Sequence, residues 1–170
     1  MALKLNIPTQ DELEALAAEL GSQLLRLGLQ LCTAESCTGG WVASCLTAIA
    51  GSSRWFERGF VTYSNAAKSE LLGVPETTVS RHGAVSEATA RAMAQGALAH
   101  SPAHWSLAIT GIAGPDGGSA EKPVGTVCFA WAQRDGGCSA NTSLFAGDRR
   151  AVRAQAVAYA LQQLRQRLPD

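Results

Sequence analysis

Helical and strand-like patterns alternate along this chain of 170 residues, and no other feature constrains its fold as strongly. A Thr-x-x-Glu capping box at Thr9 to Glu12 opens a helical pattern that continues to residue 30 with leucines at helical spacing. Strand patterns cover residues 29–34, 59–63, 105–110, 124–133 and 138–145, and further helical patterns cover residues 41–49, 66–72, 86–99 and 148–168.

The order of these elements predicts the fold class. Strands that alternate with helices are typical of parallel pairing, whereas the Gly136-Gly137 turn late in the chain predicts an antiparallel hairpin. We therefore expect an α/β fold in which residues 1–170 form one domain, a three-layer α/β/α sandwich around a single mixed sheet.

Charge and apolar patterning exclude several kinds of partner. Fourteen basic residues balance fourteen acidic ones, and non-specific nucleic-acid binding requires an excess of Lys and Arg. The apolar runs are far shorter than the ~20 residues that a membrane span needs, and the start of the chain lacks the apolar run of a secretory signal. The sequence thus predicts a cytoplasmic protein with no nucleic-acid or membrane partner.

Cysteine and histidine spacing argues against a metal site. The five cysteines form no Cys-x-x-Cys pair and are odd in number, which predicts buried thiols in a reducing compartment. The three histidines show no metal-binding spacing. No metal and no cofactor are expected.

Three polar, glycine-containing segments follow predicted strands, at residues 35–40, 63–68 and 110–118. Ligands of open α/β sheets bind beyond the carboxyl ends of strands, so these segments are candidates for a site. The first offers helix-start N–H groups to an anion, although an ordinary turn capped by Ser36 or Thr38 is the favoured interpretation of this segment taken alone. The third lacks the Gly-Lys-Ser/Thr of a P-loop and precedes a strand, which excludes a Walker motif or a dinucleotide fingerprint.

Lysine is scarce, and Lys68 falls in the first turn of the predicted 66–72 helix with no carboxylate three or four residues later. The helix dipole disfavours an ammonium there, and a lysine of lowered pKa suits a general base. A solvent-facing lysine is the alternative. Tyr63 is either a ligand of the same pocket or a half-buried strand residue. The last helix begins with Asp148-Arg149-Arg150, and an arginine there is either a phosphate ligand or a solvated charge.

A series of motifs in order along nearly the whole chain resembles the CinA C-terminal domain family. These motifs are Thr33-Ala34-Glu35-Ser36-Cys37-Thr38-Gly39-Gly40, Gly51-Ser52-Ser53, residues 59–68 (GFVTYSNAAK), Leu71-Leu72-Gly73-Val74, Gly83-Ala84-Val85-Ser86 and residues 110–118 (TGIAGPDGG). The resemblance implies an α/β/α sandwich and a nicotinamide mononucleotide deamidase, which hydrolyses the carboxamide to nicotinic acid mononucleotide and ammonia without a cofactor.

The resemblance also implies roles for single residues. The catalytic group is Ser53, Tyr63 and Lys68, with Lys68 or Tyr63 taking the proton of the Ser53 nucleophile; Ser36 is the next candidate nucleophile by position. The substrate-binding positions are Glu35, Ser36, Thr38, Gly39, Thr110, Gly111 and Arg150.

Two other functions stay open from the sequence: a non-catalytic module that binds a nucleotide, and a serine-lysine amidase acting on another small amide. The partner expected beyond the small-molecule nucleotide is a second copy of the chain, in a dimer to which Trp41, Trp55 and Phe56 contribute. Larger family members carry an additional N-terminal domain, and residues 1–30 contain only one predicted helix, so no second activity is expected.

Overall fold

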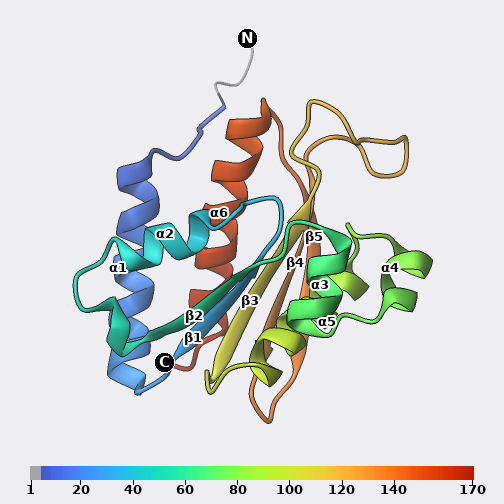
Figure 1. Ribbon diagram of the computed structural model, residues 1–170. Helices are drawn as coiled ribbons and strands as arrows, with labels where there is room; N and C mark the ends of the chain where they lie inside the picture. Colours follow the sequence, from blue (N-terminus) through green and yellow to red (C-terminus); the bar gives the residue numbers. More distant parts are fainter. Residues whose placement is uncertain (1–4) are drawn as a thin grey trace.

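The computed structural model describes residues 5–170 and has three layers, with helices on both faces of one sheet (Figure 1). The five strands lie in the order β2-β1-β3-β4-β5. Their bounds are β1 Leu31–Glu35, β2 Phe56–Val61, β3 Trp105–Gly111, β4 Thr126–Gln133 and β5 Cys138–Leu144. Strand β1 is parallel to both β2 and β3, and β4 is antiparallel to β3 and β5. The predicted mixed sheet and hairpin are confirmed.

Helices α1, α2 and α6 cover one face of the sheet, and α3, α4 and α5 cover the other (Figure 1). Their bounds are α1 Gln10–Leu27, α2 Trp41–Thr47, α3 Asn65–Leu72, α4 Glu76–His82, α5 Glu87–Ala99 and α6 Arg149–Arg167, with a short 3-10 turn, η1, at Ser52–Arg54. The predicted capping box is present: the Thr9 hydroxyl accepts from Glu12 N–H and the Glu12 carboxylate accepts from Thr9 N–H. No described helix is long and apolar enough to cross a membrane.

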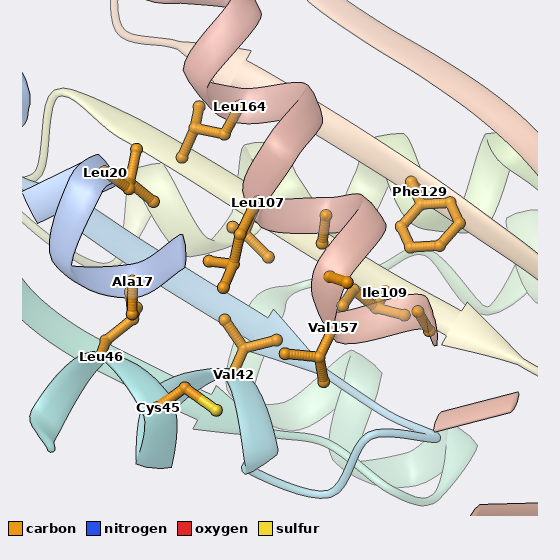
Figure 2. Close-up of a cluster of buried hydrophobic side chains, with 14 of the residues drawn as sticks. Ala17, Leu20, Val42, Cys45, Leu46, Leu107, Ile109, Phe129, Val157 and Leu164 are labelled. Atoms are coloured by element: carbon orange, nitrogen blue, oxygen red, sulfur yellow. The ribbon is translucent and has the colours of Figure 1, made fainter. Parts of the chain in front are cut away.

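The core on the α1/α6 side is built from large side chains (Figure 2). Leu20 of α1 and Leu164 of α6 meet Leu107 of β3, and Val42 of α2 packs into the same cluster. Trp55 is only 3% exposed and lies in this core, against Gly21. Its predicted place in a dimer interface is therefore wrong, because its ring is already buried within the chain.

The core on the other face uses small side chains, so α5 lies close to the sheet and to α3. Ala90, Ala94 and Ala97 of α5 are fully buried there. Helix α4 was not predicted, because its Thr-Thr-Val segment has low helix propensity; Pro75 precedes its first residue and fixes the start.

Strand direction determines where the polar segments gather. Since β1, β2 and β3 are parallel, their carboxyl ends lie at one edge of the sheet. The segments that follow Glu35, Val61 and Thr110 consequently meet at that edge.

Candidate functional site

A cleft of about 280 Å³ opens at the carboxyl edge of the three parallel strands. It is lined by Ser36, Cys37, Tyr63, Asn65, Lys68, Ala84, Val85, Thr110, Gly111, Ala113 and Arg149. All three polar segments predicted to follow strands contribute to it.

Lys68 and Ser36 are in direct contact at the floor of the cleft. The Nζ of Lys68 donates to Ser36 Oγ at 3.0 Å and to the carbonyl of Thr62 at 3.1 Å. Ser64 caps α3 by accepting from Ala67 N–H, which places Lys68 one turn into the helix and facing the sheet. Lys68 is only 1% exposed, so the alternative of a solvent-facing lysine does not hold.

The surroundings of Lys68 favour the neutral amine. Burial lowers the pKa of this lysine from its ordinary value, because desolvation penalises the ammonium form. Within the described residues, no carboxylate forms a salt bridge with it. A neutral amine in contact with a hydroxyl is the arrangement that a lysine general base requires.

The chain turns sharply between β1 and α2, and this segment, residues 36–40, is called here the 36–40 turn. Gly39 and Gly40 adopt positive φ values of 59° and 98°, which side chains with a Cβ rarely adopt. The turn is held from α6 as well, since Arg153 Nε donates to Cys37 O at 3.0 Å and its Nη2 donates to Thr38 O at 3.1 Å.

Glu35 lies behind the 36–40 turn rather than in the cleft. Its carboxylate accepts from Thr38 Oγ1 at 2.6 Å, from Val42 N at 2.9 Å and from Ala43 N at 3.1 Å. Burial raises the pKa of Glu35, and these hydrogen bonds oppose the rise. Glu35 and Thr38 are both 0% exposed, which leaves neither side chain free to contact a ligand.

Tyr63 and Arg149 form the outer wall of the cleft. The Tyr63 side chain is 63% exposed, and its hydroxyl accepts from Arg149 Nη2 at 3.0 Å. Arg149 also donates through Nη1 to Gly114 O at 2.8 Å, so the guanidinium joins β2's end to the loop after β3. Tyr63 follows the end of β2 and lines the cleft, so the alternative of a half-buried strand residue does not hold.

The end of β3 forms another wall of the cleft, through Thr110 and Gly111. Thr110 Oγ1 donates to Ala84 O at 2.8 Å, which ties β3 to the segment before α5. A Cβ at Gly111 would lie 2.8 Å from Val127 Cγ2 and 3.1 Å from Cys37 Sγ, so a larger residue would force these side chains to shift. Burial raises the pKa of the Cys37 thiol to about 12, so this neighbour of Ser36 stays protonated and is a poor nucleophile.

A second cleft, of about 550 Å³, adjoins the first at the start of α6. It is lined by Ala113, Pro115, Val124, Gly147, Asp148, Arg149, Arg150 and Arg153, and it shares Ala113 and Arg149 with the first cleft. Arg150 and Arg153 also lie over the ring of Trp41, at 6.0 and 5.3 Å from its centroid. Three arginines beside a helix start make this second cleft attractive to an anion.

The structure brings together Ser36, Tyr63, Lys68, Thr110 and Gly111, but it does not place Ser53 with them. Ser53 belongs to η1, which precedes β2, whereas Tyr63 and Lys68 follow it. A strand of this length spans roughly 20 Å, so Ser53 lies at the opposite side of the sheet from the cleft, where β2 begins. Gly39 is exposed at the turn, and Arg150 reaches the second cleft rather than the first.

The sequence named Arg149 only as one of two arginines at the start of the last helix, and it gave no role to Arg153; Arg149 lines the cleft and Arg153 contacts the 36–40 turn. A signal was available, because the two residues are four apart on the predicted last helix and therefore share one face of it. Among the described residues, no group of three His, Cys, Asp or Glu side chains gathers in a way that holds a metal ion.

Comparisons with known proteins agree with this architecture. The chain is 57% identical over 156 residues to the nicotinamide-nucleotide amidohydrolase PncC of Escherichia coli K12, covering 92% of this chain and 94% of that protein. A protein of the same name from Pseudomonas putida is 51% identical and covers 92% and 97%.

Solved structures also match the fold of this chain. The competence/damage inducible protein of Agrobacterium tumefaciens matches with a TM-score of 0.89 and 46% identity, over 98% of both chains. A CinA superfamily protein of Escherichia coli matches with a TM-score of 0.89 and 40% identity, over 98% of this chain and all of that one. The CinA C-terminal domain model matches residues 13–168, and this chain belongs to that family.

Proposed function

We propose that this chain is a nicotinamide-nucleotide amidohydrolase that converts nicotinamide mononucleotide to nicotinic acid mononucleotide and ammonia, with Ser36 as nucleophile and Lys68 as general base. The observation that carries the residue roles is the 3.0 Å contact between Lys68 Nζ and Ser36 Oγ in a buried setting. The reaction class is supported by the 57% identity to a relative named for that activity.

Acylation begins when the neutral Lys68 amine takes the Ser36 hydroxyl proton. The Ser36 oxygen then attacks the carboxamide carbon, and the C=O bond opens to a tetrahedral oxyanion. As the C–N bond breaks, the Lys68 ammonium returns the proton to the departing nitrogen, which leaves as ammonia. The product of this step is an ester of Ser36, and Lys68 is neutral again.

Deacylation repeats these steps with water. Lys68 takes a proton from a water molecule, the hydroxide attacks the ester carbon, and the proton returns to Ser36 Oγ as the C–O bond breaks. Lys68 suits both steps because its two hydrogen-bond partners, Ser36 Oγ and Thr62 O, hold the amine at the serine.

Backbone amides near Ser36 supply the oxyanion donors. Ile112 N donates to Thr126 O across the β3/β4 pair, so the adjacent N–H of Gly111 points to the other side of β3, where β1 has already ended at Glu35. That N–H faces the 36–40 turn. The N–H of Cys37, the residue after the nucleophile, is the second donor, as in other serine hydrolases.

The second cleft takes the substrate's phosphate. Arg149 lines both clefts, which supports a place for it between the carboxamide and the phosphate end of one nucleotide. Arg150 and Arg153 supply further positive charge beside the start of α6. A cytoplasmic location stays a proposal supported by five free cysteines, and the homodimer stays a prediction.

Serine-to-alanine variants test the nucleophile. Ser36→Ala is expected to lower kcat by on the order of 10⁴-fold or more, because it removes the attacking oxygen. Ser53→Ala is the matched control and keeps kcat within about twofold, since Ser53 lies at the far edge of the sheet. Ammonia release from nicotinamide mononucleotide gives the measurement. An active Ser36→Ala together with an inactive Ser53→Ala reverses the assignment.

A further inference from the structure

The resemblance implied that Glu35 contacts the substrate, yet the structure buries this carboxylate completely. It lies at the start of α2, where the first N–H groups of a helix have no partner within the helix. Residue Gly40, the N-cap of α2, provides no side-chain cap. Glu35 fills this role from the preceding strand by accepting from Val42 N–H and Ala43 N–H.

The same carboxylate also holds the 36–40 turn. Its Oε1 accepts from the Thr38 hydroxyl at 2.6 Å, two residues after Ser36. All three groups that face Glu35 in these hydrogen bonds are donors, so the site is built for an acceptor with two oxygens. The backbone N–H of Ser36 is fixed separately, by Ile109 O of β3 at 2.9 Å.

We infer that Glu35 is a positioning residue, whose carboxylate fixes the 36–40 turn to the start of α2 so that Ser36 Oγ stays in contact with Lys68 Nζ. This inference rests on the proposed function, in which Ser36 is the nucleophile. Glu35 acts through the turn and touches no part of the substrate, because its side chain is enclosed by Thr38, Val42 and Ala43.

Replacing the carboxylate by a carboxamide removes one acceptor. In Glu35→Gln the oxygen can still accept, but the NH₂ group faces a donor, and the turn must shift to separate them. A shift of about 1 Å between nucleophile and base can lower kcat by on the order of 10²-fold. The KM for nicotinamide mononucleotide should stay within about threefold, because no substrate contact is lost.

A second readout isolates Ser36 from the nucleotide. Phenylmethylsulfonyl fluoride is small and carries no phosphate, so its rate of reaction with Ser36 reports only the alignment with Lys68. We expect Glu35→Gln to slow this reaction by a factor similar to the loss in kcat. Thr38→Val removes one hydrogen bond while keeping shape, and a smaller loss in both rates, of about 3- to 10-fold, is expected from it. If Glu35→Gln does not fold, the two rates of Thr38→Val test the positioning role of Glu35.

Thr9→Ala is the control for a purely structural cap. It removes the hydroxyl that caps α1, away from the cleft, and should lower the melting temperature while leaving kcat unchanged. The inference is overturned if Glu35→Gln or Thr38→Val lowers the melting temperature and leaves kcat unchanged. It is also overturned if Glu35→Gln raises KM with kcat unchanged, because that result indicates a substrate contact. If Ser36→Ala is active, the proposed role of Ser36 as nucleophile fails; if Ser36→Ala is inactive but the Glu35 and Thr38 variants turn over normally, the positioning role alone fails.

Discussion

The amine of Lys68 lies in a buried site that destabilises its ammonium form. Its side chain is 1% exposed, and its two hydrogen-bond partners are a neutral hydroxyl and a backbone carbonyl. Burial lowers the pKa of the amine, so the unfolded chain holds the proton to higher pH than the folded chain does. If Lys68 is the general base proposed above, its lowered pKa should affect both activity and stability as pH changes.

The pH dependence of kcat/KM should show an acid limb that belongs to Lys68. Activity is expected to rise with pH as the amine loses its proton, with a midpoint below the model-peptide value of ~10.4. Lys68→Arg should be as inactive as Lys68→Met, because a guanidinium keeps its proton throughout this range. Rates of ammonia release between pH 5 and about pH 10 test this. Near-normal turnover by Lys68→Arg would mean that the position supplies charge alone.

The free energy of unfolding should also depend on pH through Lys68. Between the folded-state and unfolded-state pKa values of Lys68, the unfolded chain binds more protons, so the free energy of unfolding contributed by this residue increases with pH across that window. Lys68→Met lacks this increase. Urea unfolding of both proteins at several pH values measures the difference, and parallel pH curves would contradict the burial argument.

At the scale of elements, α3 owes its position to close contact with α5. The carbonyl of Leu72, in the last turn of α3, would lie 2.0 Å from a Cβ at Gly96 of α5. Glycine at this position lets the two helices approach until backbone meets backbone. Because Lys68 is on α3, this contact also sets how far the amine reaches toward Ser36.

Gly96→Ala should separate α3 from α5. We expect the free energy of unfolding to fall by about 1–3 kcal/mol, as for other overpacked sites, and kcat to fall as Lys68 moves with its helix. Gly137→Ala is the control, because a Cβ there meets nothing within 4 Å, and it should change stability by less than about 1 kcal/mol. Chemical denaturation and steady-state kinetics of both variants give the comparison. Unchanged stability in Gly96→Ala would show that the helices separate freely.

For the molecule as a whole, local signals predicted the elements well because each depends on neighbours in sequence. The capping box at Thr9 appears as expected, and α6 begins at Arg149, one residue after the predicted start of the last helical pattern. The pairing of Ser36 with Lys68 was harder to predict, since it depends on which segments meet at one edge of the sheet. The order of Ser53, β2 and Lys68 along the chain did contain the answer, because one strand separates the two residues.

The choice between neighbouring arginines depended on the rotation of α6, which sequence alone did not define. Successive helical residues point about 100° apart, so Arg149 faces Tyr63 and the first cleft while Arg150 faces Trp41. Only the packing of α6 on the sheet, through fully buried residues such as Val152 and Val157, selects between them.

The two adjoining clefts predict how substrate length affects binding. Arg149→Ala should raise KM for nicotinamide mononucleotide about 10- to 100-fold, the loss of a charge-assisted contact with phosphate. Nicotinamide riboside, which has no phosphate, should lose much less. Arg150→Ala is the comparison: it should raise KM for the mononucleotide and leave the riboside unaffected, because Arg150 lines only the second cleft, where the phosphate is proposed to bind. Equal losses on both substrates would show that Arg149 reads another part of the ligand.

The two hydrogen bonds from Arg153 to Cys37 O and Thr38 O connect residues 116 and 115 positions apart in the chain. A polypeptide leaves the ribosome from its amino end, so Ser36 and Lys68 emerge long before α6, the helix whose Arg153 holds the 36–40 turn. A nascent or prematurely terminated chain that lacks α6 carries both reactive groups without this support. We therefore expect amide hydrolysis only from chains long enough to include α6, because shorter chains lack the helix that holds the 36–40 turn.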